Sequence, residues 1–216
     1  MTAASPKPKQ RRRRTQERAE LTRDKLLQTA AQLFSDRGYD AVSVREIEME
    51  AGVQRNLLTY HFGSKEGMWK SVASDLLSKL EQFREVRDNV LRDLAPHERL
   101  AYVIRSFVRF SAENPEFNRM MLHEGKRDSW RMAWLADTML RPAAEELREL
   151  IAQDEAIHLK GDEFISWYYM FIGGGSTLFA IAPEAKHVFG VDTLTDKIID
   201  QHAQMMVELL LSRASE

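Results

Sequence analysis

Apolar residues recur at helical spacing along almost the whole chain, and no stretch of any length alternates between apolar and polar residues. Between Thr22 and Arg37 they fall three and four positions apart, which predicts an amphipathic helix. Gly38 suits the left-handed position that closes a helix. The apolar stripe consists of Leu26, Leu27, Ala30, Leu33 and Phe34. The same spacing through the rest of the chain predicts an all-α fold of about nine helices.

Two short helices joined by a tight turn are predicted next. Ser43 can cap the first of them, and Glu46 three residues later completes a capping box. Gly52 permits the sharp reversal that packs one helix against the next. The following helix is predicted over residues 54–60, and a longer one begins after Ser64. This arrangement is typical of a helix–turn–helix.

Prolines divide the second half of the chain. Pro96 suits a helix start, and Asn114-Pro115 ends that helix and opens a short one. Pro142 lacks an N–H and clashes with the preceding turn, so it must kink or divide the helical pattern of residues 128–154. Two further helices are predicted over residues 162–182 and 193–212.

Composition narrows the class of protein. Hydrophobic residues make up 44% of the 216 residues, which is enough for a buried core. No apolar run approaches the roughly 18–20 residues that cross a bilayer, and the N-terminus lacks the apolar segment of a secretory signal. The absence of cysteine excludes disulfides and thiolate chemistry. We therefore expect a cytoplasmic protein that does not bind membranes.

Charge is distributed unevenly along the chain. Residues 1–70 carry 14 Lys and Arg and 9 Asp and Glu, a net charge of +5, and the remaining residues have a net charge of −7. A basic head (residues 1–70) on an acidic body (residues 71–216) indicates that the head binds a polyanion. Residues 1–19 are predicted to be a disordered basic arm, in which Arg13 and Arg14 can lie along phosphates or enter a narrow minor groove. The alternative is a tail that only aids solubility.

Many residues of the predicted head resemble the N-terminal DNA-binding domain of the TetR family. They occur in the order and at the spacing of that family, over about residues 20–70, and are Thr22-Arg23, Ala30-Ala31, Leu33-Phe34, Gly38-Tyr39, Ser43-Val44, Ile47, Ala51-Gly52-Val53, Tyr60, His61-Phe62 and Ser64-Lys65-Glu66. The resemblance implies a DNA-binding domain over residues 20–70 and a helical effector-binding and dimerisation domain over residues 71–216.

The chain departs from the family at four positions. The family most often has Ser where Gln54 stands, Gly or a small residue at Asn56, an aromatic residue at Thr59 and Ala at Glu48. Loss of the usual cap at Gln54 is expected to weaken the first turn of the recognition helix by about 1 kcal/mol.

The second helix of a helix–turn–helix lies in the major groove, where base edges carry a distinct pattern of donors and acceptors. Arg55 could bind guanine or, equally, a phosphate, and Gln54 or Asn56 could bind adenine. Ser43 and Arg45 begin the preceding helix, whose N–H groups favour a phosphate. Tyr60, His61 and Lys65 resemble the phosphate-contacting group of the family. The predicted DNA contacts are Arg13, Arg14, Ser43, Arg45, Gln54, Arg55, Asn56, Thr59, Tyr60, His61 and Lys65.

By the same resemblance, the body should hold a pocket for a small apolar or amphipathic effector. The candidate lining residues are Phe107, Met121, Trp130, Trp134, Trp167, Tyr168 and Phe171. Aromatic residues and Met suit an apolar pocket, but the same residues on a helix also form ordinary core. Arg105, His123 and Glu124 could be polar anchors or surface charges.

The last two predicted helices are expected to form a homodimer. Their apolar residues are Phe164, Trp167, Tyr168, Phe171, Leu178, Leu194, Ile198, Met205, Leu209 and Leu210. The run Gly173-Gly174-Gly175 predicts either a kink or a close helix–helix approach, because glycine inside a helix costs about 1 kcal/mol relative to Ala.

These features predict a ligand-responsive repressor that binds a palindromic operator on double-stranded DNA as a dimer and is released by a small molecule. The alternative is an activator or architectural DNA-binding protein without an effector. The sequence contains no nucleophile elbow, zinc-ligand spacing or phosphate-binding loop, so neither an enzyme nor a cofactor or metal site is expected.

Overall fold

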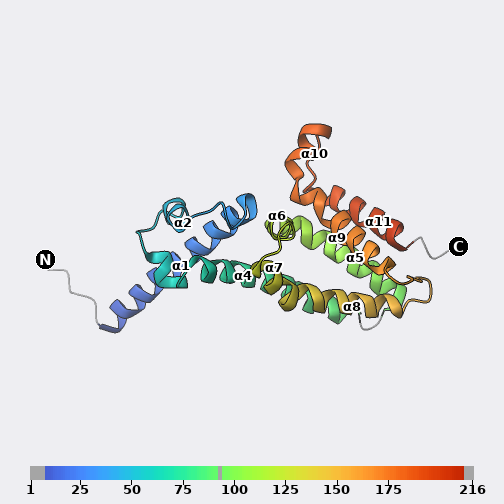
Figure 1. Cartoon of the computed structure of the whole chain (residues 1–216), viewed down its shortest axis with the longest axis horizontal. Helices are drawn as coiled ribbons and strands as arrows, with labels where there is room; N and C mark the ends of the chain where they lie inside the picture. The colour runs from blue at the N-terminus through green and yellow to red at the C-terminus, as the bar shows by residue number, and fades with distance from the viewer. Residues whose placement is uncertain (1–7, 92–93, 212–216) are drawn as a thin grey trace. The chain divides into compact units, whose positions relative to one another are not determined.

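The computed structural model describes residues 8–91 and 94–211 (Figure 1). Every regular element within these residues is helical, which confirms the all-α prediction. The contacts divide the chain into two compact units, with the boundary between Asp75 and Leu76. The predicted boundary lay five residues earlier, at residue 70.

The first unit contains α1 (Pro8–Arg37), α2 (Val44–Glu50), α3 (Leu57–Phe62) and the beginning of α4 (Lys65–Leu91). Helix α1 packs against both α2 and α3. The side chains that fill the space between these helices are buried, and they are Leu26, Ala30, Leu33, Phe34, Val42, Ile47, Leu58, Met68, Trp69 and Val72. The predicted stripe of the first helix is therefore the core of this unit, except that Leu27 is only half-buried.

Helix α1 begins at Pro8, well before the predicted start at Thr22. Residues 8–19, which were expected to belong to a disordered arm, are helical. Pro8 is compatible with the first position of a helix, and the Lys, Gln, Arg, Glu and Ala residues that follow have high helix propensity. Gln16 also donates a 3.2 Å hydrogen bond to Glu20 one turn later. Residues 1–7 of the predicted arm lie outside the described residues.

The second unit continues α4 and adds α5 (Pro96–Glu113) and α6 (Pro115–Glu124), whose starts match the predicted proline positions. The long pattern around Pro142 is divided, as predicted. Helix α7 (Trp130–Leu135) leads into a π-helical turn, η1 (Ala136–Leu140), and then into α8 (Arg141–Ala152). The wide π turn lies where the ring and missing N–H of Pro142 would otherwise disturb the preceding carbonyl groups.

The remaining elements are α9 (Glu163–Ala180), α10 (Ala182–Phe189) and α11 (Asp196–Leu211). Helices α5, α9 and α11 lie side by side and enclose the main core of the unit (Figure 1). Helix α10 was not predicted, although Pro183 near its start and Gly190 just after its end are ordinary helix-boundary signals. It buries none of its own residues.

Within the described residues, no single helix is long and apolar enough to cross a membrane. Helices α9 and α10, which meet at a 69° bend, satisfy that criterion only when they are taken together.

Candidate nucleic-acid interface

The turn between α2 and α3 has a defined backbone conformation. Gly52 adopts a positive φ of 64°, and the Val53 N–H donates a 3.0 Å hydrogen bond to the carbonyl oxygen of Glu48. Asn56 also adopts a left-handed conformation, with φ 68°. Asn tolerates this conformation better than most residues with a side chain, and Gly tolerates it best. The residue type at this position is therefore restricted by the backbone as well as by any contact with DNA.

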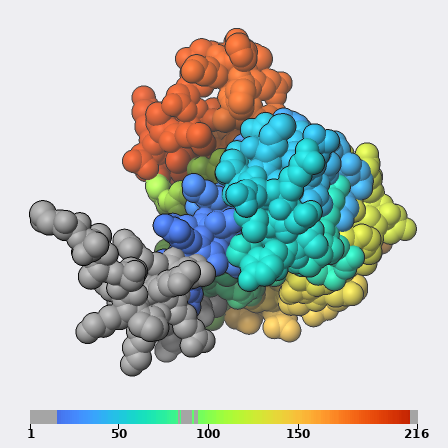
Figure 2. Space-filling model, turned by 90° about the vertical axis from the view of Figure 1, so that its left-hand side faces the viewer, coloured from blue at the N-terminus to red at the C-terminus, as the bar shows by residue number. Residues whose placement is uncertain are grey.

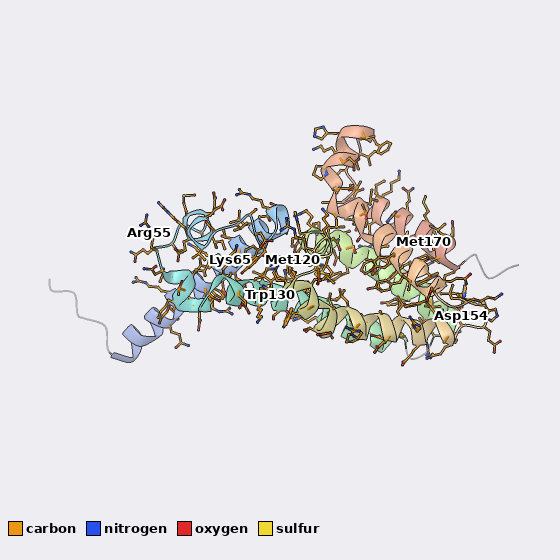
Figure 3. All side chains as sticks on the ribbon, in the orientation of Figure 1. Arg55, Lys65, Met120, Trp130, Asp154 and Met170 are labelled. Carbon is orange, nitrogen blue, oxygen red and sulfur yellow. The ribbon has the colours of Figure 1, made fainter. Side chains whose placement is uncertain are left out.

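The predicted base-reading residues do not all lie on the recognition helix. Helix α3 begins at Leu57, so Gln54, Arg55 and Asn56 lie on the turn before it, and only Thr59 lies on the helix itself. The left-handed Asn56 explains the later start, because a helix cannot include that conformation. All four side chains are exposed, and within the described residues Arg55 has no hydrogen bond or ion pair. Arg55 lies at the outer edge of this turn (Figure 3).

The start of α2 has the predicted capping box. Ser43 Oγ accepts a 3.1 Å hydrogen bond from the Glu46 N–H, and a Glu46 carboxylate oxygen accepts one of 3.4 Å from the Ser43 N–H. Glu46 also pairs with Arg37 at the end of α1. Arg45 is exposed on the same turn. The cap leaves the Ser43 hydroxyl hydrogen available to a phosphate, beside a cationic side chain.

The end of α3 and the start of α4 present the group predicted to contact phosphates. Tyr60 is 78% exposed, and its ring meets the His61 ring edge-on, with centroids 5.0 Å apart. Lys65 Nζ lies 4.1 Å from the ring centroid of Tyr39, which holds the ammonium group at the surface. Figure 2 shows the α2–α3 segment, in light blue and cyan, on the surface of the first unit. The side chains of Arg13 and Arg14 lie outside the described residues.

Glu48 also belongs to this interface, although the sequence alone gives it no role. Its side chain is 5% exposed, and its Oε1 accepts a 3.0 Å hydrogen bond from the Leu58 N–H in the first turn of α3. The signal that could have identified it is its place on the inward face of α2, next to Ile47. A charged residue on an inward face needs a partner.

The residues proposed to line an effector pocket separate into core and surface groups. Trp167 and Phe171 belong to the main core, where their rings stack 5.7 Å apart and Trp167 Nε1 donates to the Leu210 carbonyl oxygen. Phe107 packs on Phe171 at 4.7 Å. Tyr168 is half-buried, and burial is the main reason why the pKa of its hydroxyl is raised. Met121 and Trp134 are half-buried, and Trp130 is 40% exposed.

Two of the suggested polar anchors are already engaged. Glu124 is buried and accepts a 2.8 Å hydrogen bond from Arg131, which is buried as well. Arg105 donates a 2.8 Å hydrogen bond to Gln204 at the rim of a hollow of about 330 Å³ between α5 and α11. None of the seven proposed pocket residues lines that hollow. His123 is half-buried on α6.

The last two helices expose part of their apolar surface. Ile165, Tyr169 and Met170 of α9 and Met205 and Leu209 of α11 are between 39% and 68% exposed. The remaining predicted interface residues divide between the core of the unit (Phe164, Trp167, Phe171 and Leu210), half-buried positions (Tyr168, Leu178 and Ile198) and the exposed loop before α11 (Leu194). A second apolar surface, not predicted, is provided by Val188 and Phe189 of α10.

Residues 26–72 match the family described as bacterial regulatory proteins, tetR family. Over 73 residues the chain is 41% identical to the HTH-type transcriptional repressor KstR2 of Mycolicibacterium smegmatis. That alignment covers 33% of this chain and 36% of the relative, so it spans about a third of the length of either protein.

Similarity to solved structures extends over most of the chain. The structure of AibR in complex with isovaleryl coenzyme A and operator DNA has a TM-score of 0.65 and 20% identity, and the match covers 88% of this chain and 98% of that one. FadR from Bacillus subtilis in complex with stearoyl-CoA has a TM-score of 0.62 and 18% identity, covering 87% and 97%. At these identities the likeness demonstrates a common fold for both units.

Proposed function

We propose that this chain, which belongs to the TetR family of bacterial regulatory proteins, represses transcription by binding a palindromic operator as a homodimer. The observation that carries the proposal is the surface of the α2–α3 turn. There Gln54, Arg55 and Thr59 are exposed, Arg55 has no partner within the described residues, and the surrounding head has a net charge of +5 over residues 1–70. Exposed donors of this kind are suited to base edges in the major groove.

Phosphate contacts are proposed on both sides of that turn. Ser43 and Arg45 stand at the N-terminus of α2, and Tyr60, His61 and Lys65 stand at the end of α3 and the start of α4. Contacts of this kind orient a protein on the duplex, whereas base contacts specify the sequence. Arg13 and Arg14 are proposed to add contacts from the N-terminal end of α1.

A homodimer is proposed through α9 and α11. The exposed apolar residues Ile165 and Tyr169 are followed on the same face of α9 by Gly173. A Cβ at this position would meet no side chain and no other helix within 4 Å in the part of the chain that the structure describes. An open glycine beside exposed apolar side chains suits close approach by another helix. A two-fold dimer would place its two α2–α3 turns about one helical turn of DNA apart, roughly 34–36 Å, or a multiple of it.

An amphipathic small molecule is proposed to control the affinity for DNA. AibR and FadR both hold an acyl-CoA in their structures, so acyl-CoA thioesters are the first effectors to test here. Helix α4 is the proposed path of the signal, because it begins beside α3 and continues past the unit boundary. Beyond that boundary Lys79 pairs with Glu116 of α6 at 3.8 Å, and Arg84 pairs with Glu146 of α8.

The test begins with selection of bound sequences from a random pool of duplex DNA. An inverted repeat bound by a dimer is the expected result, and no enrichment, or binding by a monomer, contradicts the proposal. Affinity for the selected site is then measured with a series of acyl-CoA thioesters of increasing chain length, with free coenzyme A as the control. A weakening of DNA binding by one or more thioesters supports effector control. Unchanged affinity with the series contradicts an acyl-CoA effector and favours the alternative of a regulator without one.

A further inference from the structure

We infer that Glu48 positions the turn that presents Gln54, Arg55 and Asn56, and that it thereby determines how selectively the protein binds DNA. The inference rests on the proposed function, since it concerns the same surface. Glu48 holds both ends of this turn. Its carbonyl oxygen accepts the Val53 N–H at 3.0 Å, and its side-chain Oε1 accepts the Leu58 N–H at 3.0 Å.

Helix α3 needs such a contact because it has no cap of its own. Its N-cap residue, Asn56, is left-handed and makes no side-chain capping bond. The first N–H groups of a helix have no partner within the helix, and a helix of six residues is not stable by itself in water. A carboxylate oxygen from α2 supplies the missing acceptor, and its negative charge is favourable at a helix N-terminus.

The contact also explains why a carboxylate can be buried at this position. Glu48 is 5% exposed on the inward face of α2, where the TetR-like pattern most often has Ala. Ala cannot accept a hydrogen bond from α3. Gln54 lies two residues before the N-cap Asn56, so it is not at the capping position of α3. Glu48 therefore supplies, from the neighbouring helix, the cap that the turn itself does not provide.

The consequence for recognition is geometric. Ser43 and Arg45, at the start of α2, are proposed to contact phosphates, whereas Gln54 and Arg55 are proposed to contact bases. Glu48 belongs to the same helix as the first pair and is bonded to both ends of the turn that carries the second. It therefore fixes the position of the base-reading side chains relative to the residues that are proposed to contact the DNA phosphates. Loss of that link should lower affinity for the preferred site more than affinity for other DNA, which depends mainly on phosphate contacts.

The experiment compares Glu48→Gln with Glu48→Ala in the full-length protein. Both variants remove the negative charge, so its repulsion of DNA cancels in the comparison. Gln keeps the hydrogen-bond acceptor and the side-chain volume, whereas Ala removes both, and the ratio of the two DNA affinities separates a loss of positioning from a general loss of stability. Glu50→Ala is the matched control, because Glu50 is an exposed carboxylate on the same helix. Affinities for the selected operator and for a scrambled duplex are measured well below the melting temperature of every variant. Exchange of the Leu58 amide hydrogen is measured in parallel.

We expect Glu48→Ala to lower the ratio of operator affinity to scrambled-DNA affinity about tenfold and to speed exchange at Leu58. Glu48→Gln should keep most of the ratio and of the protection, and Glu50→Ala should keep both. If Glu48→Ala does not fold, Glu48→Asp takes its place, because it keeps the charge but shortens the reach by one methylene. An unchanged ratio in either replacement, even with a lower melting temperature, overturns the inference. A wild-type protein that does not distinguish the two duplexes overturns the proposed function instead.

Discussion

Gly175 of α9 lies directly against the ring of Phe107 on α5. A Cβ at residue 175 would stand 2.9 Å from Phe107 Cδ1, which is closer than real Cβ contacts come, and 3.0 Å from Cε1, which is tighter than most of them. We therefore expect Gly175→Ala to force α5 and α9 apart and to lower the free energy of unfolding by about 1–3 kcal/mol. Urea denaturation followed by circular dichroism measures this change. An alanine variant as stable as the wild type would mean that the two helices can separate freely.

The first glycine of the run, Gly173, has the opposite surroundings, because among the described residues no side chain and no other helix lies within 4 Å of where its Cβ would stand. Gly173→Ala should stabilise α9 by roughly 0.5–1 kcal/mol through helix propensity alone. Gly173→Leu should be tolerated in the monomer but should weaken a dimer that is packed over this face. Sedimentation equilibrium of the two variants makes the comparison, with the alanine variant as the control. Equal dissociation constants would exclude Gly173 from the dimer interface.

The glycine run illustrates what the sequence could predict. Three glycines inside a helix predicted either a kink or a close helix–helix approach. Helix α9 is continuous, and Gly174 and Gly175 lie close to Met206 and Phe107 of the neighbouring helices. The choice depended on which helices pack together, and that information is not local. Features that depend on neighbouring residues, such as the Ser43 cap and the division at Pro142, were predicted correctly.

The candidate site was predicted only in part, because some of its geometry also depends on contacts between residues that are distant in the sequence. The exposed residues of the turn, and the group proposed to contact phosphates, follow from spacing and resemblance. The start of α3 does not, because it depends on the left-handed conformation of Asn56. The role of Glu48 depends on a hydrogen bond to a residue ten positions later on another helix. The apolar pattern also did not separate pocket from core, since Trp167 and Phe171 are ordinary members of the main core.

Gly67, in the first turn of α4, is required by the end of α3. A Cβ at residue 67 would lie 2.1 Å from the carbonyl oxygen of Phe62, which is a backbone atom that cannot move independently. Gly67→Ala should therefore destabilise the head by about 1–3 kcal/mol and displace the segment that contains His61 and Lys65. Thermal unfolding and operator affinity test these two effects. Ser74→Ala, an exposed position farther along α4, is the control. Wild-type stability and affinity in Gly67→Ala would contradict the close contact.

The ion pair of Glu124 and Arg131 is buried, with side chains 3% and 7% exposed and 2.8 Å between Glu124 Oε2 and Arg131 Nε. Arg131→Met should cost about 3–5 kcal/mol, because it removes the cation that pairs with a buried carboxylate at 2.8 Å. The double variant with Glu124→Gln should recover part of that loss. Arg141→Met is the matched control, since Arg141 and Asp137 form an exposed pair whose loss should cost less than about 0.5 kcal/mol. Equal losses for the buried and exposed arginines would show that burial does not strengthen the pair.

Arg55 and Lys65 are expected to contribute to DNA binding in different ways. Arg55 is exposed on the turn before α3 and is proposed to contact a base, so Arg55→Ala should cost about 1–3 kcal/mol on the preferred operator and relax preference at one position of the site. Lys65 is proposed to contact a phosphate, so Lys65→Ala should weaken binding to every sequence and lower the slope of log affinity against log salt by about 1. Affinities for the operator and its single-base variants across a salt series separate the two. Lys197→Ala, on the exposed start of α11, controls for overall charge. If both head variants lose the same affinity on every sequence, Arg55 contacts a phosphate and base reading must come from Gln54, Asn56 or Thr59.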